Sequence, residues 1–400
     1  MRVRDSRPPF AGLANLSEEQ LHRLPTPCYL LDEAQLCRNG EILLGVQQRT
    51  GCRILLAQKA FSNFNVYPVL APYLAGTEAS GLYESRLGRE ELPEKENHVF
   101  CAAYRTDEFE ELLQYADHIV FNSPSQLAKF GPAAKAAGKS IGLRINPECS
   151  TQEGHEIYDP CAPGSRLGTT RAQWDAAVAA HPELPALLDG LHFHTLCEQD
   201  ADVLAVTLAA VEKKFADLLP RMKWLNFGGG HHITRPGYAL ATLENCILSV
   251  RQKYGVQVYL EPGEAVALNA GYLVTEVCDI VHNGMDILIL DASAACHMPD
   301  VLEMPYRPPL RDSFPAGEQK YTYRLSSLTC LAGDVIGDYS FTHEIQIGDR
   351  LVFEDMAIYS MVKNNTFNGI PLPSIAMLRE DGEVEMLKQF GYEDFKGRLS

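Results

Sequence analysis

The stretch RILLAQK, residues 53–59, is a short apolar run that ends on a lysine, and similar runs recur downstream of it. From about residue 34 to residue 262, short apolar runs alternate with amphipathic segments that are long enough to form helices. This alternation is typical of repeated strand–helix units that build a parallel sheet. We therefore predict that RILLAQK is the first strand of such a sheet.

Seven further runs of the same kind follow along the chain. They are AGTEAS, HVFCA, HIVFN, IGLRIN, LHFH, WLNF and VQVYLE, which begin near Ala75, His98, His118, Ile141, Leu191, Trp224 and Val256. Helix-like stretches such as DEFEELLQYA lie between them, and several begin with a capping Asp or Ser. Eight such units predict an α/β fold with a closed (β/α)8, TIM-like barrel. AGTEAS is the weakest strand, so a doubly wound open sheet is the alternative.

The alternation of apolar runs and helix-like stretches ends after the last of these units. Runs such as YTYRLSS and RLVFEDMAIYSM, separated by Gly, Pro and Asp, predict a second, antiparallel β domain over residues 266–400. We expect the barrel to cover residues 35–265 and the extended segment 24–34 to join the β domain. Residues 1–23, which are rich in Arg, Pro and Ser, are expected to form a flexible leader.

Composition limits the partners and the compartment. The 400 residues include 35 Lys and Arg against 52 Asp and Glu, a net charge of -17. This balance repels nucleic acids and anionic membranes and favours a cationic small molecule. The eleven cysteines form no C-x-x-C pair, and no apolar stretch is long enough to span a bilayer. We therefore expect a cytoplasmic protein without nucleic-acid or membrane partners.

Chemistry-bearing residues fall at the ends of the predicted strands. Lys59 ends the first strand, His194 the sixth and Glu261 the eighth, and Gly228–Gly230 follow the seventh. In barrel enzymes the active site gathers at the carboxyl ends of the strands, often with a phosphate after strands seven and eight. These residues are therefore predicted to share one rim of the barrel.

Each of these features also has an ordinary explanation. A lysine often marks only a strand end, and three glycines often form only a turn, although their N–H groups suit an anion. Glu261 could bind a pyridine nitrogen or simply precede the Pro-Gly turn. His192 and His194 share one face of a strand, which suits a metal or stacking on a cofactor. We favour stacking and predict that the protein binds no metal.

Several longer motifs carry a resemblance to a known family. The chain resembles the pyridoxal-phosphate (PLP) decarboxylases with the alanine-racemase-like barrel. Within that family it is most similar to the enzymes that convert carboxynorspermidine and carboxyspermidine to norspermidine and spermidine in polyamine biosynthesis. The motifs span about residues 25 to 391 and include LYESRLGRE, GLRINPE, SRLG, GLHFHTLCEQ, NFGGGHHIT, YLEPGEA, HMPD, LTCLAGD and YSMVKNNTFNG.

The resemblance implies a role for each matching residue. Lys59 would carry PLP covalently, His194 would stack on its ring, and Glu261 would pair with its pyridinium nitrogen. Cys330 would come from a second subunit and supply the proton that replaces CO2, which implies a homodimer with shared active sites. The remaining residues expected around the cofactor are Arg144, Gly228, Gly229, Gly230, Gly263 and Tyr359.

The chain departs from the ornithine-type pattern in two places. Glu264 follows EPG where those enzymes have an arginine that helps to hold the phosphate. A carboxylate cannot do that, so we expect Glu264, together with Asp300 and Asp334, to bind the cationic nitrogens of a carboxylated triamine. Gln58 precedes the lysine where an apolar residue is more usual, and the sequence does not explain it.

Other functions remain open at this stage. The same fold and cofactor serve decarboxylases of ornithine, arginine or diaminopimelate, and racemases, which would need a second base opposite Lys59. A non-catalytic PLP carrier is a further alternative, although such proteins are usually the barrel alone. A metal-dependent hydrolase using His192 and His194 is the last alternative.

Overall fold

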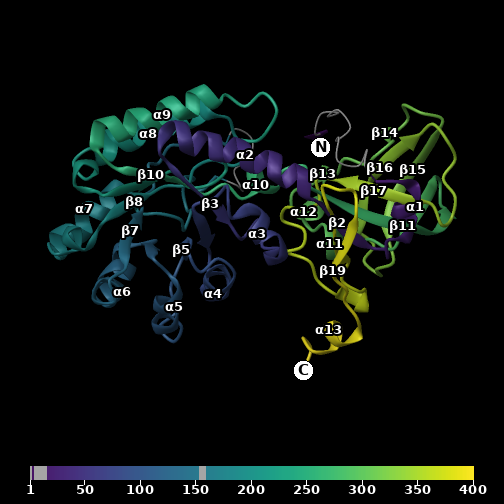
Figure 1. Cartoon of the computed structure of the whole chain (residues 1–400), viewed down its shortest axis with the longest axis horizontal. Coiled ribbons are helices and arrows are strands. Elements are labelled where there is room, and N and C mark those ends of the chain that lie inside the picture. The colour runs from purple at the N-terminus through teal and green to yellow at the C-terminus, as the bar shows by residue number, and fades with distance from the viewer. Residues whose placement is uncertain (1, 4–15, 153–158) are drawn as a thin grey trace. The chain divides into compact units, whose positions relative to one another are not determined.

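The chain folds into two compact units. The computed structural model describes residues 2–3, 16–152 and 159–400 (Figure 1). The barrel unit runs from Arg38 to Val266, and the sheet unit combines Met1–Cys37 with Ala267–Ser400. The sheet unit is therefore assembled from both ends of the chain.

Eight parallel strands close the barrel. β10 pairs in parallel with both β9 and β3, so the sheet has no free edge. The (β/α)8 prediction is confirmed, and the open-sheet alternative is wrong. The strands, in barrel order from β3, are β3 (Arg53–Ala57), β4 (Gly76–Ala79), β5 (Glu96–Phe100), β6 (His118–Phe121), β7 (Ser140–Arg144), β8 (Gly190–His192), β9 (Trp224–Asn226) and β10 (Gln257–Leu260).

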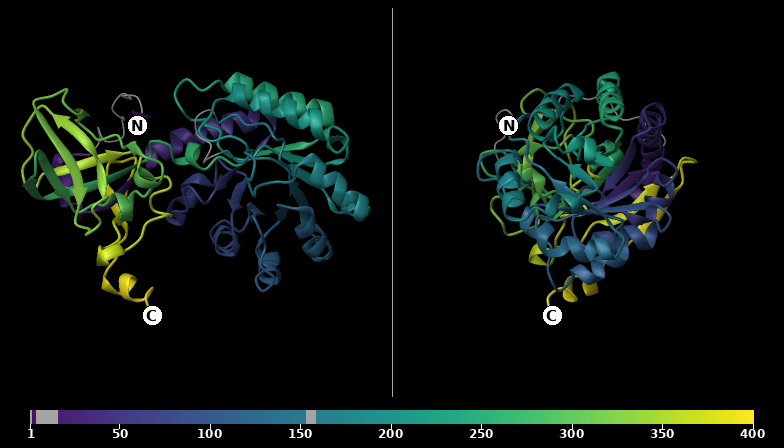
Figure 2. Two further views of the ribbon diagram at one scale, coloured as in Figure 1. Left: turned by 180° about the vertical axis from the view of Figure 1, so that it is seen from behind. Right: turned by 90° about the vertical axis from the view of Figure 1, so that its left-hand side faces the viewer.

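Helices surround this barrel, as the two views of Figure 2 show. Several begin at side-chain caps: Thr170 forms a capping box with Gln173, and Ser123 accepts a hydrogen bond from the backbone of Gln126. The helices are α2 (Glu33–Thr50), α3 (Tyr67–Leu70), α4 (Leu82–Glu91), α5 (Phe109–Tyr115), α6 (Pro124–Ala136), α7 (Arg171–Ala180), α8 (Ala201–Phe215), α9 (Leu240–Tyr254) and α10 (Glu264–Ala267).

Large side chains fill the middle of the barrel. Trp224 packs there in a cluster with Leu55, Phe100, Val120 and Tyr259. Two glycines make room for its indole. A Cβ atom at Gly142 or Gly190 would lie 2.3 or 2.0 Å from the Trp224 ring. The interior is therefore a packed core that separates the two ends of the barrel.

The sheet unit contains a nine-stranded sheet. β2 (Cys28–Asp32) pairs antiparallel with β11 (Gly271–His282) and parallel with β18 (Ser374–Leu378). β12 (Asp286–Leu290) and β15 (Tyr321–Ser327) are also parallel. The sheet is thus mixed rather than wholly antiparallel. Both parallel pairs join strands that are distant in sequence, because parallel strands need a long connection between them. Its other strands are β14 (Phe314–Pro315), β16 (Val335–Phe341), β17 (Arg350–Glu354) and β19 (Val384–Lys388).

Short elements complete the sheet unit. They are β1 (Arg2–Val3), which pairs with β13 (Tyr306–Arg307), and the helices α1 (Glu18–Arg23), α11 (Ala294–His297), α12 (Asp300–Glu303) and α13 (Tyr392–Lys396). No helix among the described residues is both long and apolar enough to cross a lipid bilayer.

The predicted leader, residues 1–23, is described only in part. Residues 1 and 4–15 of it lie outside the described residues, and residues 18–23 form α1. Helix α1 begins at a capping box between Ser17 and Gln20, and Arg350 donates hydrogen bonds to the carbonyl oxygens of Leu21 and Leu24. These bonds satisfy backbone groups at both ends of the helix and tie it to the sheet unit.

Candidate active site

The structure brings the predicted rim residues of the barrel together. Lys59 lies two residues beyond β3, His194 two residues beyond β8 and Glu261 directly after β10. Because parallel barrel strands all end on the same side, their next residues meet at that side. Contacts among these residues and their neighbours define a polar cluster at the carboxyl end of the barrel.

Glu78 is a central member that the sequence analysis missed. Its carboxylate Oε2 lies 3.7 Å from Lys59 Nζ and has no hydrogen-bond partner among the described residues. The Glu78 side chain is 1 % exposed and that of Lys59 33 %. Burial raises the pKa of Glu78 to about 8, although the charge of Lys59 opposes the shift. The sequence could have indicated Glu78 as a site residue, because it is the one ionisable residue in the predicted strand AGTEAS, which otherwise contains only small residues.

Glu261 is held from two sides. His192 Nε2 lies 3.0 Å from one carboxylate oxygen, and Asn226 Nδ2 donates to the other at 2.5 Å. Burial alone raises the pKa of a carboxyl group, but His192 and Lys59 outweigh it and hold the pKa of Glu261 below its ordinary value. Burial lowers the pKa of His192, so its neutral ring donates from Nε2. Glu261 is therefore an oriented, ionised carboxylate.

His194 and Arg144 are fixed beside this pair. The backbone N–H of Gly229 donates to His194 Nδ1 at 3.2 Å, which places the ring proton on Nε2. Burial and the charge of Lys59 keep the pKa of His194 well below its ordinary value. Arg144 donates to the carbonyl oxygen of His194 at 3.2 Å and lies over the Phe100 ring, 4.6 Å from its centroid. His194 is thus a neutral, flat ring with a fixed orientation.

The triple-glycine loop forms a tight connection next to these residues. Gly228 and Gly230 have positive φ angles of 70° and 79°, which only glycine adopts without strain. Gly228 N–H donates to Asn226 Oδ1 at 2.9 Å, and the carbonyl oxygen of Gly230 accepts from Gln199. The N–H groups of Gly228 and Gly229 thus have protein partners here, which an anion would have to replace.

The second loop predicted to hold phosphate contains a buried pair. His232 Nε2 lies 3.1 Å from Glu264 Oε1, and their side chains are 4 % and 12 % exposed. Gly263, in the same loop, packs against Ala60, since a Cβ atom there would lie 2.5 Å from the Ala60 Cβ. Glu264 is therefore engaged by a histidine within the barrel unit, a contact that the sequence analysis did not anticipate.

Gln58 has a structural explanation. Its side chain is completely buried. Tyr67 Oη donates to Gln58 Oε1 at 3.0 Å, and Gln58 Nε2 donates to the carbonyl oxygen of Glu84 at 2.9 Å. The amide therefore satisfies a tyrosine hydroxyl and a helix backbone behind the lysine, which an apolar side chain could not do.

The sheet unit carries the other predicted site residues. Cys330 lies on an exposed loop, where its N–H donates to Asn368 Oδ1 at 2.8 Å. Leu328 and Leu331 flank it and are 53 % and 44 % exposed. Tyr359 is half-buried and has a positive φ of 53°, a strained conformation for a non-glycine residue.

Asp334 and Asp300 already have partners. Asp334 is 1 % exposed and accepts hydrogen bonds from the hydroxyls of Ser293, Ser327 and Thr329 and from two backbone N–H groups. Its contacts therefore favour holding the Cys330 loop rather than binding substrate. Lys363 forms ion pairs with both Asp300 and Glu303. A substrate nitrogen at Asp300 would have to compete with that lysine.

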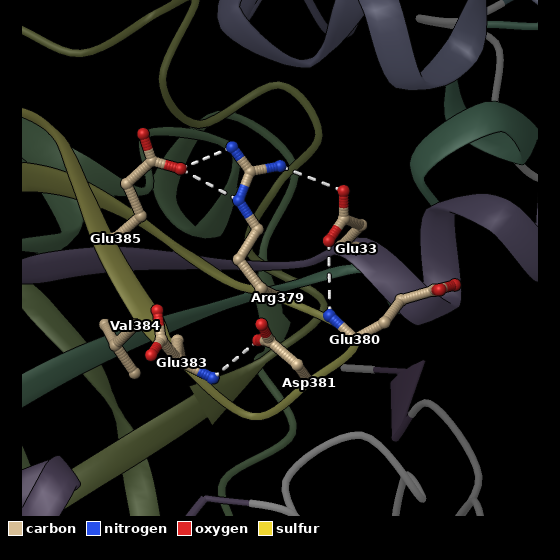
Figure 3. Close-up of a pocket in the computed structure, with 7 residues that line it drawn as sticks. All are labelled: Glu33, Arg379, Glu380, Asp381, Glu383, Val384 and Glu385. Atoms are coloured by element: carbon tan, nitrogen blue, oxygen red, sulfur yellow. Dashed lines mark hydrogen bonds and ion pairs between the residues drawn. The ribbon is translucent and has the colours of Figure 1, made fainter.

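A pocket of about 610 Å³ lies within the sheet unit (Figure 3). Arg379 pairs there with Glu33 at 2.9 Å and with Glu385. The other lining residues are Glu380, Asp381, Glu383 and Val384. None of the predicted site residues lines it. Of its acidic side chains, Glu33 and Glu385 form the ion pairs with Arg379 that link α2 to β19.

The barrel-end cluster fits PLP better than a metal. His192 is committed to Glu261, and no group of metal-ligand spacing among the described residues includes His192 or His194. By contrast, an amine beside an unpartnered buried carboxylate, a neutral flat ring and an ionised carboxylate match the aldehyde, the ring face and the pyridine nitrogen of PLP. The structure therefore supports Lys59, His194 and Glu261 as cofactor-binding residues.

Comparisons with known proteins show the family of the chain. The family model described as the pyridoxal-dependent decarboxylase, C-terminal sheet domain, matches residues 28–357. The chain is 41% identical to the carboxynorspermidine/carboxyspermidine decarboxylase of Campylobacter jejuni, over 94% of this chain and 99% of that protein. It is 42% identical to the carboxyaminopropylagmatine decarboxylase of Synechocystis, over 96% and 98%.

A solved structure extends the similarity to three dimensions. It is the carboxynorspermidine decarboxylase of Campylobacter jejuni in complex with norspermidine. That structure superimposes with a TM-score of 0.86 at 39% identity and covers 94% of this chain and all of that one (100%). The similarity therefore includes both the barrel unit and the sheet unit.

Proposed function

The chain belongs to the pyridoxal-dependent decarboxylase family, and from that membership we propose that it decarboxylates carboxynorspermidine, carboxyspermidine or both in polyamine biosynthesis. The observation that carries the proposal is the cluster of Lys59, Glu78, His192 and Glu261 at the carboxyl end of the barrel. PLP, when bound, supplies an electron sink for the electron pair that departing CO2 leaves behind.

Each residue of the cluster in the barrel unit has its own role toward PLP. Lys59 would hold the cofactor through its amine. Glu78, with a pKa of about 8, can accept or return a proton at Lys59 Nζ, 3.7 Å away. Glu261 keeps a proton on the pyridine nitrogen, and His192 and Asn226 fix the orientation of Glu261. His194 covers the ring with a neutral face.

We further propose that Cys330 protonates the carbon that loses CO2 in the active site of a second subunit. The exposed leucines on both sides of Cys330 support a homodimer interface at this loop. Asp334 supports the same role indirectly, because its five hydrogen bonds fix the loop that presents the thiol. The eleven free cysteines suit a reducing compartment, so we place the enzyme in the cytoplasm.

The substrate proposal draws on charge as well as on the relatives. A net charge of -17 attracts a triamine with several ammonium groups. Glu264 is our candidate for one of them, with His232 holding the carboxylate in place. A second candidate substrate, carboxyaminopropylagmatine, is favoured by the 42% identical relative from Synechocystis.

Release of CO2 from a panel of substrates tests the assignment. The panel contains carboxynorspermidine, carboxyspermidine, carboxyaminopropylagmatine, ornithine, arginine and diaminopimelate. We expect one of the first two to give the highest kcat/KM. A preference for carboxyaminopropylagmatine would favour the second candidate, and a preference for an amino acid would overturn the triamine assignment.

Subunit complementation tests the shared site. The Lys59→Ala and Cys330→Ala variants are each expected to be almost inactive as pure dimers. Mixed dimers restore one complete site if Lys59 and Cys330 act from different subunits, so mixing should recover up to about one quarter of the activity for random exchange. No recovery after verified subunit exchange would place both residues in one subunit.

A further inference from the structure

We propose that Glu96, His98 and His118 bind one divalent transition-metal ion at the amino-terminal end of the barrel, and that Zn²⁺ suits the site best. Glu96 and His98 lie at the start of β5, and His118 begins β6. Because barrel strands run in parallel, this end is opposite to the one that carries Lys59. The site therefore shares no residue with the proposed active site.

Geometry supplies the first argument. Each of the three side chains offers one ligand atom, and these atoms lie within 4.8 Å of one another. His98 Nε2 is 3.2 Å from Glu96 Oε2. Arg53 forms an ion pair with the other carboxylate oxygen, Oε1. Arg53 thereby orients Glu96 with Oε2 toward the histidines, as an outer partner orients a metal-binding carboxylate.

Unsatisfied nitrogen atoms supply the second argument. Nδ1 of His98 and Nδ1 of His118 are buried and have no hydrogen-bond partner among the described residues. The side chain of His98 is 1 % exposed. Buried polar atoms in folded proteins nearly always have a partner. Nδ1 of His192, His231 and His232 at the other end of the barrel is also without one among the described residues, but His98 and His118 differ in that their rings stack on one another beside Glu96. Rotation of either histidine ring about its χ2 angle turns its unsatisfied Nδ1 toward Glu96.

The surroundings define the kind of ion. The ring centroid of Tyr259 lies 4.7 Å from that of His98, and the ring centroid of Trp224 lies 5.3 Å from that of His118. Two imidazole nitrogens and one carboxylate oxygen are typical ligands of Zn²⁺ and its first-row neighbours, whereas Mg²⁺ and Ca²⁺ prefer oxygen alone. A water molecule would complete a tetrahedron on the solvent side of the half-buried His118.

Binding requires a small local rearrangement. The two histidine rings are now stacked, with centroids 3.9 Å apart and planes at 17°. Ligand atoms around a tetrahedral zinc ion are roughly 3.3 Å apart, whereas the three ligand atoms here lie within 4.8 Å of one another, so the more distant of them must move closer. Parallel rings also cannot both aim a lone pair at one ion. We infer that His118, the more exposed of the pair, turns out of the stack when the ion binds.

Zinc titration of the full-length holoenzyme tests the proposal. Protein treated with chelator and then freed of it is titrated with ZnCl2 in a calorimeter, and bound zinc is counted by elemental analysis. We expect one equivalent to bind and the melting temperature to rise. MgCl2 under the same conditions is expected to change neither quantity.

Two variants locate the ion. His118→Asn and Glu96→Gln should each weaken zinc binding at least tenfold, whereas His282→Asn, which removes an exposed histidine next to Asp286, should not. Circular dichroism and the absorbance of bound PLP check that each variant is folded. Equal zinc affinity in the wild type, His118→Asn and Glu96→Gln would overturn the site, as would absence of stoichiometric binding to the wild type.

Cobalt distinguishes this site from the thiols. Co²⁺ bound by nitrogen and oxygen shows visible d–d bands without the near-ultraviolet charge-transfer band that a cysteine thiolate adds. We expect the first pattern in the wild type and its loss in His118→Asn. A thiolate band that persists in His118→Asn would assign the binding to a cysteine such as Cys278 and refute the proposal.

Discussion

The two ends of the barrel contain the same residue types but differ in charge. At the carboxyl end, Lys59 and an ionised Glu261 surround the neutral His194. At the amino-terminal end, His98 and His118 stack on one another and face aromatic rings. The first end therefore presents opposite charges near a glycine loop, and the second presents two stacked imidazole rings beside a glutamate that pairs with Arg53.

The comparison shows that neighbours, not residue type, set the chemistry of a histidine in this barrel. His192 and His98 are equally buried, at 1 % exposure, and each lies next to a glutamate. His192 sits opposite an ionised carboxylate that Asn226 also binds, whereas Glu96 is shared with Arg53. The carboxyl end is thus suited to proton and electron-pair chemistry, and the amino-terminal end to stability or a metal.

The largest expected effect comes from removing the amine at the carboxyl end. Lys59→Ala should lower the rate of CO2 release roughly 10⁴-fold or more, because the covalent link to the cofactor is lost. Borohydride reduction should then attach no PLP to the protein. Lys253→Ala, an exposed lysine on α9, serves as the control. Full activity of Lys59→Ala would refute the assignment of this end as the active site.

A smaller loss is expected when the charge of Glu261 is removed. Glu261→Gln keeps the size of the side chain but cannot hold a proton on the pyridine nitrogen, so kcat should fall roughly 10²-fold. The absorbance spectrum of bound PLP should shift at the same time. Glu110→Gln, exposed on α5, should change neither property. Unchanged kcat and spectrum in Glu261→Gln would show that its carboxylate has no role toward the ring.

The amino-terminal end should respond to pH through stability. The pKa of His98 is lowered from 6.5 to about 4 in the folded protein, so the unfolded chain binds more protons between these values. The contribution of His98 is therefore fully present above pH 6.5 and is lost as the pH falls toward 4. The loss of this His98 contribution should lower the unfolding free energy at pH 5 by about 2 kcal/mol relative to pH 8.

Urea unfolding of the wild type and His98→Gln at the two pH values measures this effect. The variant should lose less stability than the wild type on acidification, whatever its stability at pH 8. An identical pH dependence in His98→Gln would mean that His98 does not titrate differently in the folded and unfolded states.

The smallest expected effect concerns the support behind Lys59. Gln58→Met keeps the volume but leaves the Tyr67 hydroxyl and the Glu84 carbonyl without their partner, so unfolding free energy should fall by about 1–2 kcal/mol. Adding Tyr67→Phe should recover part of that loss. A double variant no more stable than Gln58→Met would show that the Tyr67 hydroxyl finds another partner.

The sequence alone was enough to predict much of this protein. The alternation of apolar runs and amphipathic segments predicted all eight barrel strands, because period and turn residues are local properties. Lys59 and Glu261 were recognisable for the same reason: each follows a strand, and strand ends in a closed parallel barrel converge. The motifs around them indicated the family that the comparisons then confirmed.

Only the tertiary structure decided which residues touch. Glu78 meets Lys59 and His98 stacks on His118 because barrel closure sets the register between neighbouring strands. Gln58 meets Tyr67 because the chain folds back after β3 into α3. The same holds for Asp334, whose carboxylate accepts bonds from two separate segments of the sheet unit. Local patterns fix where a strand ends, but the partner of a buried polar group depends on strand register, which the sequence pattern of one strand does not contain.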